Sequence, residues 1–252
     1  MTLSRAARSA ALFGVIAGAM VGCGGSSDPA ADVLAASSFT DVAEPLEVLL
    51  ESELDVDIRF SFGSSASFLQ QIDQGSPATA VITADTDTMR LIEAAALVEP
   101  SVPITKNDLI IVTSDTEKAR SVRSLADLAD DDVIVVVCTS TAPCGKATDD
   151  LLASASVTLS PASREPNVRA TLTKVLLGEA DAAIVYRTDA LAHPELRTVD
   201  VGADNVGVIG RVAVVIEATD GAGGNDLGQA ILDVLTGDQA AELLAEAGFS
   251  QP

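Results

Sequence analysis

The stretch Val133-Ile134-Val135-Val136-Val137 is an unbroken aliphatic run, and Cys138-Thr139-Ser140-Thr141-Ala142-Pro143-Cys144-Gly145 follows it directly. A run of β-branched residues is typical of a strand buried on both faces of a parallel sheet. Residues 145–153 then show helical periodicity. A buried strand, a short loop and a helix in this order form the basic unit of an α/β fold.

The alternation of strands and helices continues on both sides of this unit. Further strands are predicted over 33–36, 57–62, 79–83, 109–112, 182–186 and 211–216, and further helices over 40–53, 66–74, 89–96, 168–177, 225–235 and 239–247. We therefore predict an α/β fold with mostly parallel sheets flanked by helices.

The first residues have the features of an export signal. Arg5 and Arg8 give a basic start, and 10–21 is an apolar segment too short to cross a bilayer as a stable helix. The segment ends in Met20-Val21-Gly22-Cys23, which resembles the lipobox of bacterial lipoproteins. That resemblance implies a signal peptide over 1–22, whose removal leaves Cys23 as a lipidated N-terminus. The polar stretch 23–32 predicts a flexible tether to the membrane. An ordinary signal peptide followed by a free cysteine is the alternative.

The composition limits the classes of ligand. The 252 residues carry a formal net charge of −22, and such an acidic surface repels nucleic acid. Trp is absent and aromatic residues make up 3%, which argues against a site that stacks sugars or quaternary amines on aromatic faces. The single histidine, His193, and two spaced cysteines do not make a zinc site. We expect no cofactor, and any bound anion must be held by local dipoles.

Small hydroxyl residues follow three of the predicted strands. Ser37-Ser38 and Ser64-Ser65 each precede a helix, as does the loop after Val137. A helix N-terminus carries unpaired N–H groups and about half a positive charge. Loops of this kind meet outside the carboxyl ends of the strands, where they form an anion site without cationic side chains. Ordinary helix capping by Ser and Thr is the alternative at each junction.

Taken in order, the segments from Val33 to Phe249 resemble the periplasmic molybdate-binding proteins of the type II solute-binding superfamily. The likeness is carried by 35–41 (AASSFTD), 62–65 (FGSS), 70–78 (QQIDQGSPA), 82–85 (ITAD), 167–169 (NVR), 178–182 (GEADA), 184–190 (IVYRTDA), 239–242 (QAAE) and 248–249 (GF). It implies a two-lobed periplasmic-binding-protein type II fold with its ligand in the cleft between the lobes. It also implies a monomeric, extracytoplasmic, non-enzymatic protein that delivers molybdate, and tungstate with it, to the permease and ATPase of an ABC importer.

The resemblance assigns the contacts to the oxyanion. Ser38 and Ser65 would each offer a hydroxyl and a backbone N–H, and Tyr186, the only tyrosine, its phenolic O–H. Cys144 and Val168 would each offer a backbone N–H. Arg169 and Arg187 stand at positions that are not direct ligands in the family, and we expect them at the surface or behind the ligand-binding residues.

The cysteines depart from the family pattern, because position 144 is usually a small residue such as Ala. With Cys23 lipidated and the protein outside the cytoplasm, Cys138 and Cys144 remain as a pair, and we expect them to form a disulfide. The bond also requires Cα atoms within bridging distance, which the sequence does not give.

The resemblance also predicts where the chain divides. The first lobe would hold 33–109 and 206–252, and the second 110–205, with crossings near 108–110 and 205–210. Ser38 and Ser65 then belong to the first lobe, and Cys144, Val168 and Tyr186 to the second.

Three other functions compete with molybdate capture. A binding protein for sulfate or another tetrahedral oxyanion would use the same kind of site. An adaptor lipoprotein of the same fold would bind no ligand. A serine hydrolase needs a base, and His193 lies in a predicted loop, while no Gly-x-Ser-x-Gly motif surrounds Ser38 or Ser65.

Overall fold

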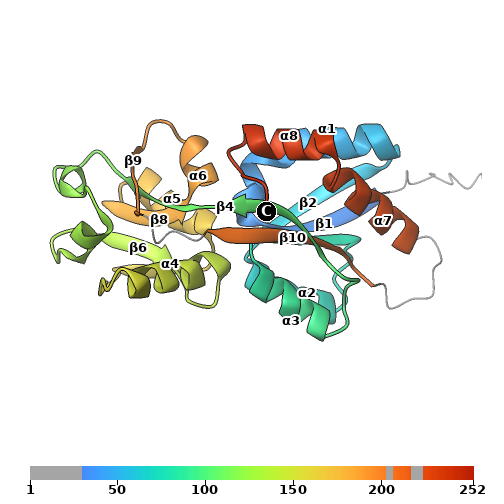
Figure 1. Ribbon diagram of the computed structural model, residues 1–252, viewed down its shortest axis with the longest axis horizontal. Coiled ribbons are helices and arrows are strands. Elements are labelled where there is room, and N and C mark those ends of the chain that lie inside the picture. Colours follow the sequence, from blue (N-terminus) through green and yellow to red (C-terminus); the bar gives the residue numbers. More distant parts are fainter. Residues whose placement is uncertain (1–29, 203–206, 217–223) are drawn as a thin grey trace, which may run out of the picture.

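Two five-stranded sheets organise the protein, whose computed structural model describes residues 30–202, 207–216 and 224–252 (Figure 1). The first sheet has the order β2 (Asp57–Gly63), β1 (Ala30–Ala36), β3 (Ala80–Thr83), β10 (Val208–Val214) and β4 (Val102–Asn107). The second sheet has the order β7 (Ser163–Glu165), β6 (Val135–Cys138), β8 (Ala182–Tyr186), β5 (Leu109–Thr113) and β9 (Arg197–Val199).

One strand of each sheet is reversed relative to its neighbours. β1 pairs in parallel with β2 and β3, whereas β10 is antiparallel to both β3 and β4. In the second sheet β6 pairs in parallel with β7 and β8, whereas β5 is antiparallel to both β8 and β9. The remaining strands of each sheet share one direction. The reversed strands β5 and β10 are the ones that follow each passage between the sheets.

Helices cover both faces of each sheet, which confirms the predicted α/β architecture (Figure 1). In the first lobe α1 (Ala43–Leu54), α7 (Gly224–Leu235) and α8 (Asp238–Glu246) lie on one face, and α2 (Ser65–Asp73) and α3 (Thr86–Ala94) on the other. In the second lobe α4 (Pro143–Ser154) covers one face, and α5 (Val168–Leu176) and α6 (Arg187–Leu191) the other. The 3₁₀ turns are η1 (Ser37–Val42), η2 (Ala119–Ser121) and η3 (Leu125–Ala129).

The central strands form the core because their side chains are buried on both faces. Every residue of β3, β5, β6 and β8 is buried. Three strands were not predicted, namely β4, β7 and β9, and all three lie at sheet edges. Their burial is partial, so their sequences carry polar residues and lack the aliphatic runs that identify central strands.

The chain passes from the first sheet to the second at Asp108, the only residue between β4 and β5. It returns between Val199 and Val208. Leu109 is predicted to lie in the first lobe, but it is the first residue of β5 in the second sheet. The second passage includes residues 203–206, which lie outside the described part of the chain.

The N-terminal boundary also differs from the prediction. The predicted tether extends to Asp32, but β1 begins at Ala30 and pairs with β2 from Asp57 onward. Ala31 is fully buried, and Asp32 forms an ion pair with Arg59 of β2 at 3.0 Å. The predicted signal peptide 1–22, Cys23 and the first part of the tether lie outside the described residues. Among the residues that the structure describes, no helix has the length and hydrophobicity needed to span a membrane.

Candidate oxyanion-binding site

A small cavity lies between the two lobes, at the ends of strands from both sheets. Its volume is about 10 Å³, which is far below the range of about 300–1,000 Å³ typical of pockets for drug-sized ligands. Its lining residues are Ala36, Ser37, Ser38, Gly63, Ser64, Ser65, Ala84, Ala142, Pro143, Cys144, Asn167, Val168 and Tyr186. All five residues predicted to contact the oxyanion are among them.

Ser38 enters the cavity from η1, directly after β1. Ala36 is the residue just before this turn, and its methyl side chain cannot accept a hydrogen bond. The first N–H groups of the turn are therefore left without a capping acceptor. The ring of Phe39 stacks on Phe249, with centroids 5.0 Å apart. This contact holds the turn against the C-terminal residues, and Ser38 is 4% exposed.

Ser65 enters from the first residue of α2. Its Oγ accepts a hydrogen bond from the Ala84 N–H at 3.0 Å. One lone pair of the oxygen is thereby used by the protein, and the hydroxyl hydrogen is free to be donated. The Ser65 N–H, the first of the helix, has no acceptor among the described residues and also stays available.

The second lobe contributes the N-termini of α4 and α5. Pro143, at the first position of α4, has no N–H, so Cys144 offers the first donor of that helix. At α5 the side chain of Asn167 accepts from the Ala170 N–H, which leaves the Val168 N–H uncapped. Four of the five predicted ligand residues therefore have a backbone N–H with no acceptor within the described part of the chain. They are Ser38, Ser65, Cys144 and Val168.

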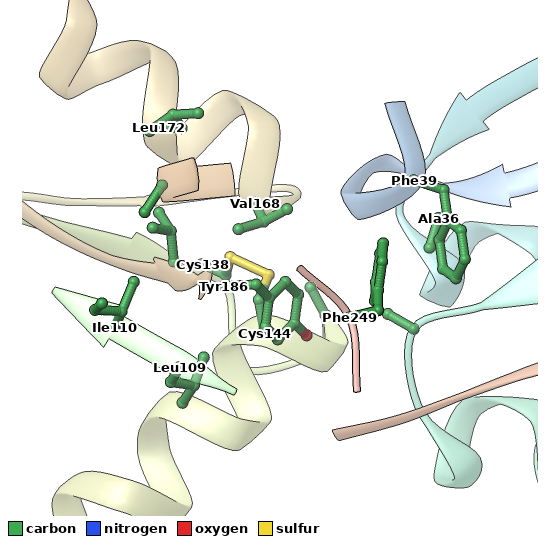
Figure 2. Close-up of a cluster of buried hydrophobic side chains, with 14 of the residues drawn as sticks. Ala36, Phe39, Leu109, Ile110, Cys138, Cys144, Val168, Leu172, Tyr186 and Phe249 are labelled. Carbon is green, nitrogen blue, oxygen red and sulfur yellow. A yellow bond between two sulfur atoms is a disulfide. The ribbon is translucent and has the colours of Figure 1, made fainter. Parts of the chain in front are cut away.

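Tyr186 completes the set from the end of β8. Its side chain is 1% exposed, and its hydroxyl has no hydrogen-bond partner among the described residues. Figure 2 shows the hydroxyl directed away from the disulfide, toward the lobe that carries Ala36 and Phe39. Burial, with Asp85 and Asp189 nearby, raises the pKa of Tyr186 well above its ordinary value. The phenol therefore keeps its proton and remains a hydrogen-bond donor. Burying this donor without a partner destabilises the protein unless a ligand accepts from it.

The sequence matches the family of bacterial extracellular solute-binding proteins over residues 31–250. This chain belongs to that family. Among its relatives is the molybdate-binding protein ModA of Mycobacterium tuberculosis (strain H37Rv), 28% identical over 217 residues, which are 86% of this chain and 81% of the relative. Membership in a family of solute-binding proteins confirms the prediction that the chain is not an enzyme.

Two solved structures show the same fold as this solute-binding protein. The periplasmic molybdate-binding protein of Azotobacter vinelandii aligns with a TM-score of 0.69 at 17% identity, covering 88% of this chain and 99% of that one. The sulfate-binding protein SubI of Mycobacterium tuberculosis H37Rv aligns with a TM-score of 0.71 at 18% identity, covering 88% and 87%. The predicted two-lobed fold of the superfamily is thereby confirmed.

The cavity of this solute-binding protein is lined by donors, and no charged side chain lines it within the described residues. Two carboxyl groups lie near Tyr186, Asp85 in the first lobe and Asp189 in the second. Burial raises the pKa of Asp85, and burial raises the pKa of Asp189 to about 7, against the opposing effect of the Arg169 guanidinium. Asp189 accepts the Tyr186 backbone N–H at 3.1 Å, and this contact orients the start of α6.

Three polar residues in the lining were not named as ligands from the sequence: Ser37, Ser64 and Asn167. Each immediately precedes a predicted ligand in the chain. Their position next to a predicted ligand could have identified them, because two consecutive residues at the start of a helix can both face the cavity.

Proposed function

We propose that this solute-binding protein captures molybdate outside the cytoplasm and delivers it to an ABC importer. The observation that supports this most directly is the cavity between the lobes, whose polar lining consists of hydroxyl, amide and unpaired N–H groups without a charged side chain. The M. tuberculosis relative is a molybdate-binding protein, which supports the same ligand.

The hydrogen-bonding sense of the lining favours a fully deprotonated oxyanion. Molybdate, tungstate and sulfate carry no proton at neutral pH and only accept hydrogen bonds. Hydrogen phosphate retains a proton that is best paired with a carboxylate, and no carboxylate lines the cavity among the described residues. The Asn167 oxygen already accepts the Ala170 N–H, and a serine hydroxyl in the lining is needed as a donor to the anion. Leaving that proton unpaired costs about 1–3 kcal/mol. The site should therefore discriminate against phosphate by about 5- to 150-fold.

The division of the ligand positions between two lobes supports a closure mechanism. Ser38 and Ser65 belong to the first sheet's lobe, whereas Cys144, Val168 and Tyr186 belong to the second. An anion that accepts from both sides is bound more tightly by the closed than by the open form, so it stabilises the closed form. The permease would recognise that form and release the anion as the lobes open about the two chain passages.

The N-terminal sequence supports attachment to the membrane. In this proposal the signal peptide 1–22 is removed, a lipid is added to Cys23, and the polar residues after it give the binding body its reach. Replacing Cys23 with Ser should release the protein from the membrane fraction, and a radiolabelled fatty acid should label the wild type but not this variant.

Sulfate is the second candidate, because SubI has the same fold and is a sulfate-binding protein. Sulfate also only accepts hydrogen bonds, so the lining alone does not separate it from molybdate. The difference must come from the size of the closed cavity, since molybdate and tungstate are larger than sulfate and nearly equal to each other.

The direct test is anion binding by the protein that begins at residue 24, measured by calorimetric titration and by thermal unfolding. We expect binding of molybdate and tungstate, and a stabilisation of about 2.7 kcal/mol at a hundred times the Kd. Tight binding of sulfate with weak binding of molybdate would identify sulfate as the ligand, and the protein would still be an oxyanion-binding protein. Binding of none of these anions would reject the oxyanion function and favour the adaptor.

A further inference from the structure

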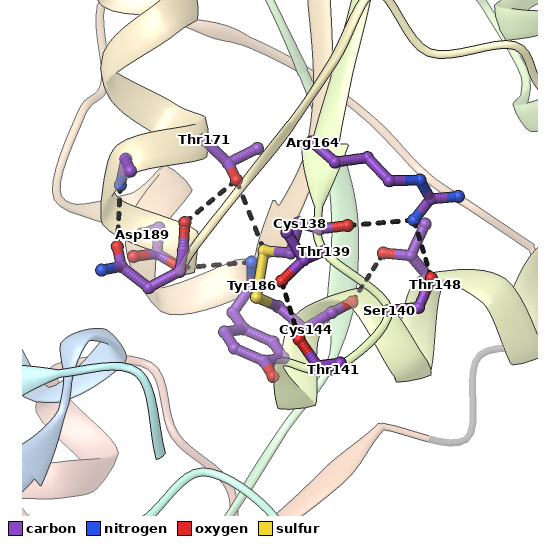
Figure 3. The surroundings of a disulfide bond; sticks show 12 residues. Cys138, Thr139, Ser140, Thr141, Cys144, Thr148, Arg164, Thr171, Tyr186 and Asp189 are labelled. Atoms are coloured by element: carbon purple, nitrogen blue, oxygen red, sulfur yellow. Dashed lines mark hydrogen bonds between the residues drawn. A yellow bond between two sulfur atoms is a disulfide. The ribbon is translucent and has the colours of Figure 1, made fainter. Parts of the chain in front are cut away.

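Cys144, which lines the cavity, is joined to Cys138 by a disulfide that lies beside Tyr186 (Figure 3). Cys138 is the last residue of β6, and Cys144 is the second residue of α4. Both are buried, with exposures of 0% and 3%. The bond therefore joins the end of a central strand to the residue whose N–H is the first free donor of the helix.

The same disulfide contacts the second donor helix of this lobe. The Oγ1 of Thr171 in α5 lies 3.4 Å from the Cys138 Sγ and donates to the Asn167 carbonyl at 3.0 Å. A disulfide sulfur carries no hydrogen, and the single Thr171 hydroxyl hydrogen is donated to the Asn167 carbonyl, so the contact with Sγ is van der Waals packing. Asn167 is the residue immediately before Val168, so the disulfide also supports the start of α5.

The start of α4 is packed tightly against the strand that the disulfide joins. A Cβ at Gly145 would lie 1.8 Å from the Thr139 carbonyl oxygen and 2.8 Å from the Cys138 carbonyl oxygen. The helix can approach the strand this closely only because residue 145 is glycine. A separation of the two cysteines would remove the covalent restraint on this approach.

Other contacts hold the same loop more weakly. Arg164 donates from Nη1 to the Cys138 carbonyl at 3.1 Å and to the Ser140 Oγ at 3.2 Å. Thr139 donates its N–H to the Glu165 carbonyl at 2.8 Å. Loss of the disulfide should therefore leave the loop folded but less restrained.

We infer that the Cys138–Cys144 disulfide is a positioning element of the oxyanion site, which sets the Cys144 and Val168 N–H groups and thereby the affinity for the anion. The inference rests on the proposed function. Donors aimed at an anion contribute fully only when they are held in place before it binds. The oxidised protein outside the cytoplasm is then the high-affinity form, and the reduced protein inside the cell binds weakly.

The test compares the Kd for molybdate of the oxidised wild type with two proteins that lack the bond. One is the double variant Cys138→Ala, Cys144→Ala, and the other is the wild type treated with a water-soluble phosphine. In that reaction the S–S bond breaks, two thiols form with protons from water, and the phosphine is oxidised to its oxide. We expect the Kd to rise about tenfold in both, which corresponds to the partial loss of donors bound to a charged group.

A control variant separates positioning from general stability. Ile92→Ala removes buried side-chain volume from α3 in the first lobe, away from the cavity, and lowers the melting temperature. Titrations are made well below all melting temperatures. A purely stabilising disulfide would lower the melting temperature as Ile92→Ala does and leave the Kd unchanged, and that result would overturn the inference.

The outcomes also separate this inference from the proposed function. If the oxidised wild type binds none of the oxyanions, the function itself fails. If it binds molybdate and the reduced wild type binds it equally well, only the positioning role fails. Should the double variant not fold, reduction of the wild type still decides the question.

Discussion

Arg169 at the start of α5 forms an ion pair with Asp41 in η1, and so joins the second lobe to the first beside the cavity. A second ion pair between the lobes links Lys146 of α4 to Asp87 of α3 at 3.4 Å. Both pairs exist only when the lobes are close together. They therefore stabilise the closed form in addition to whatever the ligand contributes.

Replacing Arg169 with Gln should weaken ligand binding through faster release. The pair is partly exposed, with side-chain exposures of 26% and 34%, so its contribution is about 0.4–1 kcal/mol. The Kd should rise about two- to fivefold, and the effect should shrink at high ionic strength. Stopped-flow measurement of the dissociation rate tests this.

The matched control is Lys174→Gln, which breaks an ion pair with Glu179 that lies entirely within the second lobe. It should leave the dissociation rate unchanged. An equal effect of both variants would show that the interlobe position of Arg169 has no special role.

Tyr186→Phe should separate binding from stability. In the ligand-free protein the Tyr186 hydroxyl has no partner among the described residues, so its removal should not destabilise the fold and should relieve an unpaired buried group. With ligand bound, the loss of a hydrogen bond to an anion should raise the Kd by about 10- to 100-fold. Thermal unfolding without ligand and calorimetric titration with molybdate test both halves. A large loss of ligand-free stability would contradict this account of Tyr186.

The two serines of the proposed site should respond differently to replacement by Ala. Ser65→Ala removes a donor and also leaves the buried Ala84 N–H without its acceptor, at a cost of about 1–3 kcal/mol in the free energy of unfolding. For Ser38 no side-chain hydrogen bond to the described residues is present, so Ser38→Ala should lower affinity at little cost to the ligand-free fold. Chemical denaturation of both variants without ligand tests the contrast, and equal stabilities would contradict it.

The interior of each sheet could be predicted because burial is encoded locally. β5 and β6 are buried at every residue and appear in the sequence as aliphatic runs. The edge strands β4, β7 and β9 could not be recognised, since a strand with one exposed side needs no such run. Ala30 to Asp32 were assigned to the tether because their composition is that of a linker, and only their pairing with β2 makes them a strand.

The candidate site was predictable to the extent that its donors lie next to recognisable loops. Ser38, Ser65 and Tyr186 each stand where a strand ends, which the sequence shows. The pairing of Arg169 with Asp41 was not predictable, because these residues are 128 positions apart and meet only through the approach of the lobes. Arg169 was expected at the surface or behind the ligands, with no partner named.

Asp189 should give the protein a pH-dependent stability. Its folded-state pKa is raised to about 7 from an ordinary value of 3.8, first by burial and then by Asp41, while Arg169 and the Tyr186 N–H oppose the shift. Between about pH 4 and pH 7 the folded protein holds a proton that the unfolded chain has released. This carboxyl therefore lowers the free energy of unfolding as the pH rises through that range, by at most about 4 kcal/mol.

Asp189→Asn should remove this dependence. The amide cannot ionise and keeps an oxygen that accepts the Tyr186 N–H, so the variant should match the wild type near pH 5 and exceed it at pH 8. Melting temperatures across this range test the prediction, with the exposed Asp131→Asn as the control that should follow the wild type. If Asp189→Asn and the wild type lose stability in parallel up to pH 8, Asp189 is already charged at pH 5. Its unpartnered Oδ1 would then be a buried negative charge behind Tyr186, and molybdate affinity should rise in the Asn variant because that repulsion is gone.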